Sequence, residues 1–247
     1  MISFRAVSKS FGDKQVLREV SFDVNPGEVL FIIGASGVGK SVLIKHLVGL
    51  LRPDSGEIWL EGEEVSHFDE ARMYPVRKKC GMVFQHSTLF DSMTCAENVA
   101  LPLRKHRSLT AEAALSEALA LLERVKMAEF ANSFPSELGD GMKKRVAIAR
   151  ALTLTPRYVL FDEPTTSLDP VSARRVDQLI RELSDTLGVT SVVVSHDLTS
   201  IFSIADRIVM LYKGKVKLVG TPHDFRTSTD GVIQQFINGR AEGPMEA

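Results

Sequence analysis

Residues 29–41 read VLFIIGASGVGKS, and this stretch decides the fold. Its first five residues form an apolar run of strand length, and an apolar segment of helical length, VLIKHLVGL, follows it at 42–50. The octet GASGVGKS at 34–41 fits the pattern G-x-x-x-x-G-K-[S/T] between a strand and a helix. The backbone N–H groups of such a loop converge on phosphate oxygens, and the helix N-terminus adds partial positive charge. The stretch therefore predicts a phosphate-binding loop in an α/β fold.

Individual residues of this loop suit different parts of a nucleotide. Gly37 and Gly39 allow the tight backbone path, Lys40 can reach the β- and γ-phosphates, and Ser41 can offer a hydroxyl to Mg²⁺. A glycine turn without a ligand is the plain alternative, which the spacing and the Lys-Ser pair disfavour. We predict that ATP contacts the loop residues Gly34, Ala35, Ser36, Gly37, Val38, Gly39, Lys40, Ser41 and Val42.

Other segments predict the sheet around the loop. YVLFD at 158–162 and SVVVS at 191–195 are continuous apolar runs, which are typical of parallel strands covered by helices on both faces. Residues 1–24 instead alternate between apolar and polar side chains, which indicates a half-exposed antiparallel sheet. Residues 207–220 predict a hairpin that turns at Lys213-Gly214.

The middle of the chain has a helical pattern. Thr110 can cap one helix, and a second helix is expected from near Gly141 to about Thr155, before Pro156. The residues expected on one face of the first helix are Leu115, Leu119, Leu122 and Val125. The predicted division is a first part of the core (1–85), a helical subdomain (86–156), a second part of the core (157–225), and a C-terminal helix with a polar tail (226–247).

Two carboxylates end the strand at 158–162. Asp162 can hold the hydration shell of Mg²⁺, and Glu163 can orient or deprotonate an attacking water. An Asp-Glu pair at a strand end is often only a solvated surface feature. Its position in the same chain as the phosphate loop favours a catalytic role.

Composition excludes several classes of protein. The formal net charge of the 247 residues is −1, which gives no overall attraction for nucleic acid, and Cys80 and Cys95 have no metal-binding spacing. No apolar run approaches the ~18 residues of a membrane span, and the N-terminus does not resemble a signal peptide. We expect a cytosolic chain that would need other subunits to act at a membrane.

Six motifs resemble those of ATP-binding cassette (ABC) ATPases, in the same order and at similar spacing. They are GASGVGKS (34–41), MVFQ (82–85), LGDGMKKR (138–145), YVLFDEP (158–164), SLDP (167–170) and VVVSHD (192–197). The resemblance covers the chain except its tail. It implies a P-loop NTPase core with a mostly parallel sheet, an antiparallel β edge and an inserted helical subdomain. It also implies ATP and Mg²⁺ as cofactors and a head-to-tail dimer of two copies.

The resemblance assigns further roles to single residues. Gln85 matches the glutamine that senses Mg²⁺ and water, His196 the histidine that holds the γ-phosphate, and Asp169 an aspartate that links the two sites of a dimer. Phe11 stands where an aromatic ring stacks on adenine; without the resemblance, Phe11 and His196 would be interpreted as structural residues. The implied catalytic residues are Glu163, His196, Gln85 and Lys40, and the implied metal-binding residues are Ser41, Gln85 and Asp162.

Two positions depart from the family pattern. Val42 replaces a threonine that gives one hydroxyl contact to the α-phosphate. The signature segment, residues 138–142, reads LGDGM instead of LSGGQ, and in the family it contacts the γ-phosphate held by the partner subunit. Gly139, Asp140 and Gly141 are therefore predicted to bind the partner's ATP. We expect Asp140 to cap the following helix and to be neutralised by Lys143 and Lys144.

A narrower resemblance points to the ATPase subunits of Mce-type (Mla-like) lipid transporters. It rests on residues 76–106, VRKKCGMVFQHSTLFDSMTCAENVALPLRKH, and on the methionine after the signature glycine. It implies a membrane permease docked near Gln85–Phe90, a periplasmic Mce-domain protein in the complex, no nucleic-acid partner, and a peripheral position on the cytoplasmic side of the inner membrane. The alternatives are the ATPase of a solute-uptake or lipoprotein-release transporter, or a degenerate cassette that binds ATP without turnover.

Overall fold

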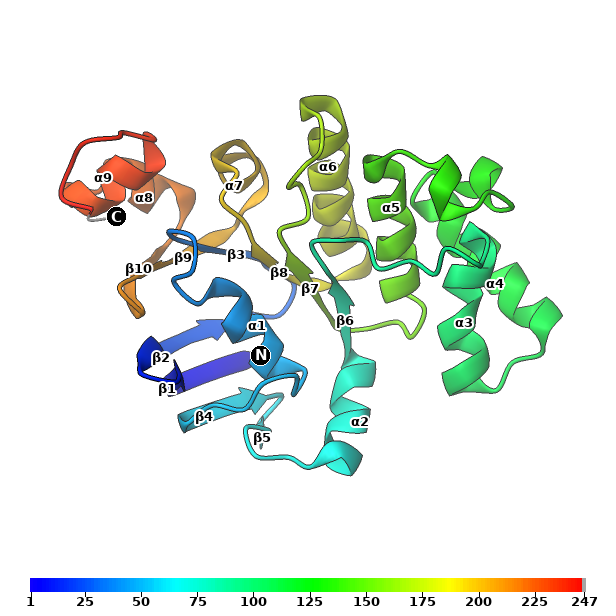
Figure 1. The fold of residues 1–247 in the computed structure, drawn as a ribbon, viewed down its shortest axis with the longest axis horizontal. Coiled ribbons are helices and arrows are strands. Elements are labelled where there is room, and N and C mark those ends of the chain that lie inside the picture. Colours follow the sequence, from blue (N-terminus) through cyan, green and yellow to red (C-terminus); the bar gives the residue numbers. More distant parts are fainter. Residues whose placement is uncertain (246–247) are drawn as a thin grey trace.

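The structure is a computed structural model that describes residues 1–245. Its larger sheet has the strand order β10-β9-β3-β8-β7-β6, and all neighbouring strands except the β10–β9 pair run parallel (Figure 1). In this order the strands are Lys215–Gly220, Arg207–Tyr212, Val29–Ile33, Thr190–Val194, Tyr158–Asp162 and Cys80–Val83. The predicted parallel core and the hairpin at Lys213-Gly214 are confirmed.

The smaller sheet is antiparallel, as the alternating N-terminal pattern predicts. Its order is β2-β1-β4-β5, with strands Lys14–Val24, Ile2–Phe11, Ser55–Leu60 and Glu63–Glu64. Helix α1 (Lys40–Leu47) lies between the two sheets in Figure 1. Strand β3 is buried throughout, and its alternate residues enter different cores: Leu30 and Ile32 join the core beside α1, and Phe31 joins the core on the opposite face. This two-sided burial explains the continuous apolar run of its sequence.

The remaining helices cover the large sheet or extend beside it. They are α2 (Glu70–Lys79), α3 (Cys95–Arg107), α4 (Ala111–Arg124), α5 (Asp140–Ala151), α6 (Pro170–Leu187), α7 (Leu198–Ile204), α8 (Pro222–Thr227) and α9 (Gly231–Ile237). Short 3₁₀ turns occur at Ala128–Phe130 and Pro135–Glu137. Helices α3, α4 and α5 contact one another and lie together beyond β6 (Figure 1).

The predicted buried face of α4 is partly wrong. Thr110 caps this helix as expected, because its hydroxyl accepts a hydrogen bond from the N–H of Ala113. However, the helix buries Ala114, Ala118, Leu122 and Val125, whereas Leu115 and Leu119 are 37% and 45% exposed. Small alanine side chains allow α4 to pack closely against α3, and this contact rotates the two leucines towards the surface.

The second predicted helix begins near Gly141, as expected, but ends earlier than predicted. Helix α5 starts at Asp140, one residue before Gly141, and stops at Ala151, several residues before Thr155. Thr155 has the left-handed φ of 47°, so the chain has already left the helix before Pro156. At the C-terminus, the backbone N–H of Met245 donates to Oε1 of Gln235 at 2.6 Å, which folds the described part of the predicted tail against α9. Positions 246–247 of that tail lie outside the described residues.

No helix among residues 1–245 combines the length and the apolar character needed to cross a membrane.

Candidate nucleotide site

The loop after β3 has a backbone path that requires glycine. Gly34 has φ 142°, and a Cβ atom on it would lie 2.4 Å from the carbonyl oxygen of Leu211. Gly39 has φ 107°, and a Cβ there would lie 2.6 Å from Cδ2 of Leu17. Helix α1 begins directly after Gly39 without a side-chain cap, so its first N–H groups are left for a ligand. The loop and helix together form an anion-binding N-terminus.

Lys40 places a cation inside this loop. It is 8% exposed, and its Nζ donates to the carbonyl oxygens of Gly34 at 2.9 Å and Ala35 at 3.1 Å. Burial lowers the pKa of Lys40, while the nearby carboxylates of Glu163 and Asp162 act in the opposite direction. The ammonium group is thus held beside the path of the phosphates.

Ser41 and Asp162 meet across the site. The Ser41 hydroxyl donates to Oδ1 of Asp162 at 2.5 Å, and Asp162 is buried at the end of β7. These two oxygen donors suit Mg²⁺, which favours carboxylate and hydroxyl oxygens together with water and nucleotide phosphates. Residues 1–245 contain no cluster of three or more His, Cys, Asp or Glu side chains placed to bind a metal. Ser41, Asp162 and the amide oxygen of Gln85 would hold a bound Mg²⁺ together with oxygens of ATP and water.

Glu163 and His196 are in close contact just beyond the ends of neighbouring strands. Nδ1 of His196 lies 2.8 Å from Oε2 of Glu163, and the Thr166 hydroxyl donates to the same oxygen at 3.1 Å. Glu163 has the left-handed φ of 51°, and its N–H donates to the carbonyl oxygen of Val194 in β8 at 2.9 Å. A non-glycine residue in this conformation costs about 1–3 kcal/mol.

Lys40, Ser41, Glu163 and His196 line one cavity of about 750 Å³, whereas Asp162 contacts Ser41 but is not part of the cavity wall. Its wall contains the predicted residues Phe11, Gly34, Ala35, Ser36, Gly37, Gly39, Lys40, Ser41, Val42, Gln85, Glu163 and His196. Val38 is the exception within the loop, because its side chain packs against the core beside α1.

The cavity also has two wall residues that the sequence did not predict, Val16 and Phe236. Val16 belongs to the ordinary alternation of β2, and Phe236 lies on the short helix α9, so neither carries a motif that could have pointed to it.

The family model described as ABC transporter matches residues 17–166, which include the phosphate loop, Gln85, the signature segment and the β7 carboxylates. The chain belongs to the ABC transporter family. It is 38% identical over 245 residues to the "Intermembrane phospholipid transport system ATP-binding protein MlaF" of Escherichia coli (strain K12), and this match covers 99% of the chain and 91% of the relative. The "Probable ribonucleotide transport ATP-binding protein mkl" of Mycobacterium leprae is 35% identical over 244 residues, covering 99% of the chain and 70% of the relative.

A solved ABC cassette, MJ0796, has a closely similar fold. Its dimeric post-hydrolysis state, bound to ADP and Pi, superposes with a TM-score of 0.81 and 33% sequence identity, covering 90% of this chain and 99% of that chain. The predicted ABC ATPase fold is therefore confirmed, as is the sequence-based resemblance to the Mla-type subunits.

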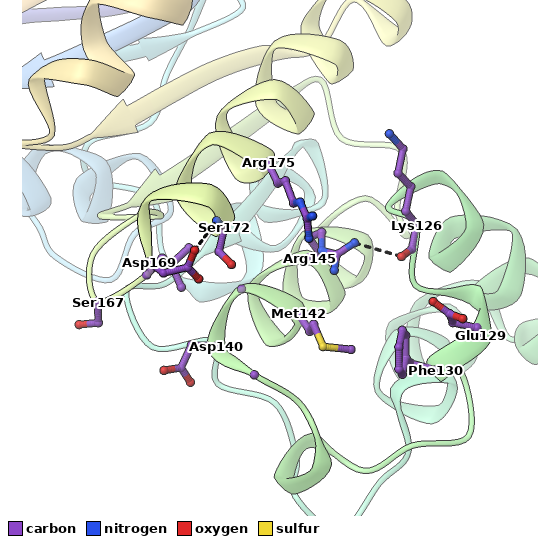
Figure 2. A pocket seen from close by; sticks show the side chains of 13 residues that line it. Lys126, Glu129, Phe130, Asp140, Met142, Arg145, Ser167, Asp169, Ser172 and Arg175 are labelled. Carbon is purple, nitrogen blue, oxygen red and sulfur yellow. Dashed lines mark hydrogen bonds between the residues drawn. The ribbon is translucent and has the colours of Figure 1, made fainter.

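The signature segment lines a different cavity from the phosphate loop. Gly139, Asp140, Gly141 and Asp169 border a cavity of about 560 Å³ between α5, α6 and the turn at Ala128–Phe130 (Figure 2). Gly141 is required by packing, because a Cβ on it would lie 2.8 Å from Cβ of Ser172 in α6. The four predicted residues therefore do not contact the nucleotide cavity of their own chain.

Asp169 caps helix α6 at this cavity. Its Oδ1 accepts hydrogen bonds from the N–H groups of Val171 and Ser172, both at 3.0 Å. Hydrogen bonds from Ser172 lower the pKa of Asp169, so the cap is ionised at neutral pH.

The prediction that Asp140 caps α5 is wrong. Gly139 is the capping residue, and it makes no side-chain hydrogen bond; Asp140 is the first residue inside the helix. The Asp140 side chain is 71% exposed, and its only ion-pair partner within the described chain is Nζ of Lys143 at 3.8 Å. A carboxylate in the first turn is favourable for the helix dipole, but this one is poorly neutralised.

The predicted partnership of Lys144 with Asp140 is wrong as well. Lys144 is 2% exposed, and its Nζ donates to the carbonyl oxygens of Phe84 at 2.9 Å and Gln85 at 2.6 Å. Lys144 therefore has backbone carbonyls as its hydrogen-bond partners, and only Lys143 is paired with Asp140. Arg145 follows the same pattern, since it donates to the carbonyl oxygen of Lys126 at 3.0 Å (Figure 2).

The loop after Gln85 presents an apolar ring to solvent. Phe90 is 49% exposed, whereas Leu89 packs against the large core. The buried Asn98 of α3 fixes Phe90 on both sides: its Oδ1 accepts from the Phe90 N–H at 2.8 Å, and its Nδ2 donates to the Phe90 carbonyl at 3.0 Å. The ring is thus held outward by a rigid backbone.

Proposed function

We propose that this chain is the subunit that hydrolyses ATP in a bacterial envelope transporter and that the transported substrate is a phospholipid. The observation that carries the hydrolytic part is the 2.8 Å contact between Glu163 and His196 on the wall of the cavity that also contains Lys40. A carboxylate, an imidazole and a buried ammonium around a phosphate loop form the set needed for attack of water on a terminal phosphate.

Each residue has a defined task in this reaction. Lys40 and the first N–H groups of α1 bind the β- and γ-phosphates, and Ser41, Asp162 and Gln85 hold Mg²⁺. When bound, Mg²⁺ neutralises charge on the phosphate oxygens. Glu163 accepts a proton from the water whose oxygen bonds to the γ-phosphorus, while the bond between that phosphorus and the β–γ bridging oxygen breaks and ADP departs.

His196 contacts the γ-phosphate in this proposal. It is 62% exposed on its side chain and shares Oε2 of Glu163 with Thr166, so it can turn towards a ligand while Thr166 keeps the carboxylate oriented.

The proposed assembly is a head-to-tail dimer with a permease. The separate position of the signature cavity supports it, because Gly139 and Gly141 can reach a phosphate only on a second copy. We place the permease on Phe90 and the loop from Gln85, and an Mce-domain protein on the periplasmic side of the same complex. The chain would then lie on the cytoplasmic face of the inner membrane.

The similarity to MlaF and the sequence phrase at 76–106 favour a phospholipid as the transported substrate. The mycobacterial relative is named for ribonucleotide transport, so the test must compare these two substrates. The chain should be purified with its co-expressed permease, placed in phospholipid vesicles and assayed for ATP-dependent movement of fluorescent phospholipid or labelled ribonucleotide. Movement of ribonucleotide alone would contradict the lipid proposal and leave the ATPase proposal intact.

The hydrolytic role is tested with Glu163→Gln. Loss of the base should lower phosphate release by about 10²-fold or more, while Mg-ATP binding is kept and a dimer accumulates in sedimentation with Mg-ATP. Glu112→Gln, which removes an exposed carboxylate from the first turn of α4, is the matched control and should keep wild-type turnover. Near-normal phosphate release by Glu163→Gln would remove this residue from the mechanism.

A further inference from the structure

Helix α5 holds the loop at residues 84–88, here called the Gln85 loop, by its backbone. Lys144 donates to the carbonyl oxygens of Phe84 and Gln85, and Arg150 donates to those of Ser87 at 3.3 Å and Thr88 at 3.0 Å. Two cations on one helix thus bind four carbonyls of one loop. The loop has no strand or helix of its own between β6 and α3, so these bonds fix its position.

The burial of Lys144 indicates that these bonds serve a specific purpose. An ammonium group that is 2% exposed is costly unless its protons are donated, and within the described residues Lys144 has no carboxylate within ion-pair distance. Hydrogen bonds from a charged donor are the strong kind.

We propose that Lys144 is a positioning residue that couples the signature segment to Gln85, so that engagement of α5 by the partner's nucleotide moves the Gln85 side chain in the chain's own site. The inference rests on the proposed ATPase function. Its basis is that Asp140 and Lys144 lie one turn apart on the same continuous helix. Asp140 borders the signature cavity, and Lys144 donates to the backbone carbonyl of Gln85, which lines the nucleotide cavity.

This arrangement links three surfaces through one side chain. The first turn of α5 borders the signature cavity, Gln85 lines the nucleotide cavity, and the Gln85 loop leads to the exposed Phe90. An apolar side chain at position 144 would fill the same volume but leave the Phe84 and Gln85 carbonyls without their donor. Arg150 would still fasten the far end of the loop, so such a variant should fold.

The experiment compares Lys144→Met with Lys144→Arg in the full chain assembled with its permease. Methionine keeps the length and loses the donors, whereas arginine restores charged donors. Lys105→Met removes an exposed charge from α3 that is not among the residues lining either cavity, and serves as the control. The readouts are kcat and KM for Mg-ATP, the melting temperature, and hydrogen exchange of the backbone amides at 84–88.

We expect Lys144→Met to lower kcat about tenfold, equivalent to ~1.4 kcal/mol in the barrier, with KM within about twofold of the wild type. Exchange at 84–88 should become faster, and Lys144→Arg should recover kcat to within about threefold of the wild type. The Lys105→Met control should keep wild-type kcat. If Lys144→Met fails to fold, Lys144→Gln, which keeps a shorter neutral donor, takes its place. The same lowered kcat with a nearly unchanged KM is expected for it.

Wild-type kcat in Lys144→Met, or no recovery by arginine at an unchanged melting temperature, would overturn the coupling role. An unchanged exchange rate at 84–88 would do the same. Absence of ATP hydrolysis by the wild-type complex would instead overturn the proposed function, so the two failures are distinguishable.

Discussion

Replacement of Phe90 by alanine should weaken docking of the permease without affecting the fold. The ring is 49% exposed, and Asn98 holds the backbone on either side of it through main-chain bonds that alanine keeps. Leu89, the adjacent residue, packs against the large core, so its truncation serves as a comparison in which folding stability is affected. The two substitutions remove apolar side chains of similar size from neighbouring positions with different surroundings.

The magnitude follows from the exposed half of the ring. A phenylalanine buries roughly 150–250 Å², so about 100 Å² remains available for a partner. At about 25 cal/mol per Å², its burial in a permease groove contributes ~2.5 kcal/mol, or a change of about 60-fold in the dissociation constant. Leu89→Ala should instead lower the free energy of unfolding by about 2 kcal/mol or more, as core truncations do.

The assay combines permease-stimulated phosphate release with denaturant unfolding of the isolated chain. Phe90→Ala should lose stimulation at low permease concentration, recover it at high concentration, and keep its affinity for Mg-ATP and its unfolding midpoint. Leu89→Ala should shift the midpoint. A destabilised Phe90→Ala chain, or undiminished stimulation at every permease concentration, would refute docking through this ring.

Two further predictions concern the first turn of α5. Asp140→Asn should raise permease-coupled ATP hydrolysis about fivefold or more at low salt, because Lys143 neutralises the Asp140 carboxylate only weakly and this carboxylate then repels the partner's phosphate. Two charges ~4 Å apart interact by about 1 kcal/mol in water and by about 4 kcal/mol at an effective dielectric of 20. The gain should shrink as salt is added, and an unchanged rate at low salt would show that this carboxylate lies away from the partner's phosphate. Because the pKa of Lys144 is lowered from 10.5 to about 8, the unfolded chain binds more protons than the native chain between these values, so the contribution of this group to stability rises with pH there. Denaturant titrations of the wild type and of Lys144→Met at pH 7.5 and pH 10 measure this contribution. The free energy of unfolding of the wild type should increase relative to that of Lys144→Met at pH 10, and a difference that is the same at both pH values would contradict the prediction.

The sequence alone determined the parallel core, the phosphate loop and the strand-end carboxylates. These features depend on local patterns: a strand buried on both faces is apolar throughout, as in VLFII at 29–33, and the loop needs glycine where no Cβ fits, as at Gly34. The hairpin at Lys213-Gly214 and the cap at Thr110 are equally local, since each depends on the backbone preference or hydroxyl of one or two residues.

Only the tertiary structure decided which partners these side chains have. The periodicity of α4 predicts a helix, but the close packing against α3 selects the alanine face and leaves Leu115 and Leu119 exposed. Lys144 lies four positions from Asp140 and was therefore expected to pair with it, whereas the fold brings in the carbonyl of Gln85, 59 positions away. A backbone carbonyl is present at every residue and leaves no mark in the sequence. The sequence likewise does not predict that Phe236 lines the nucleotide cavity, because its position depends on how the C-terminal helix packs against the core.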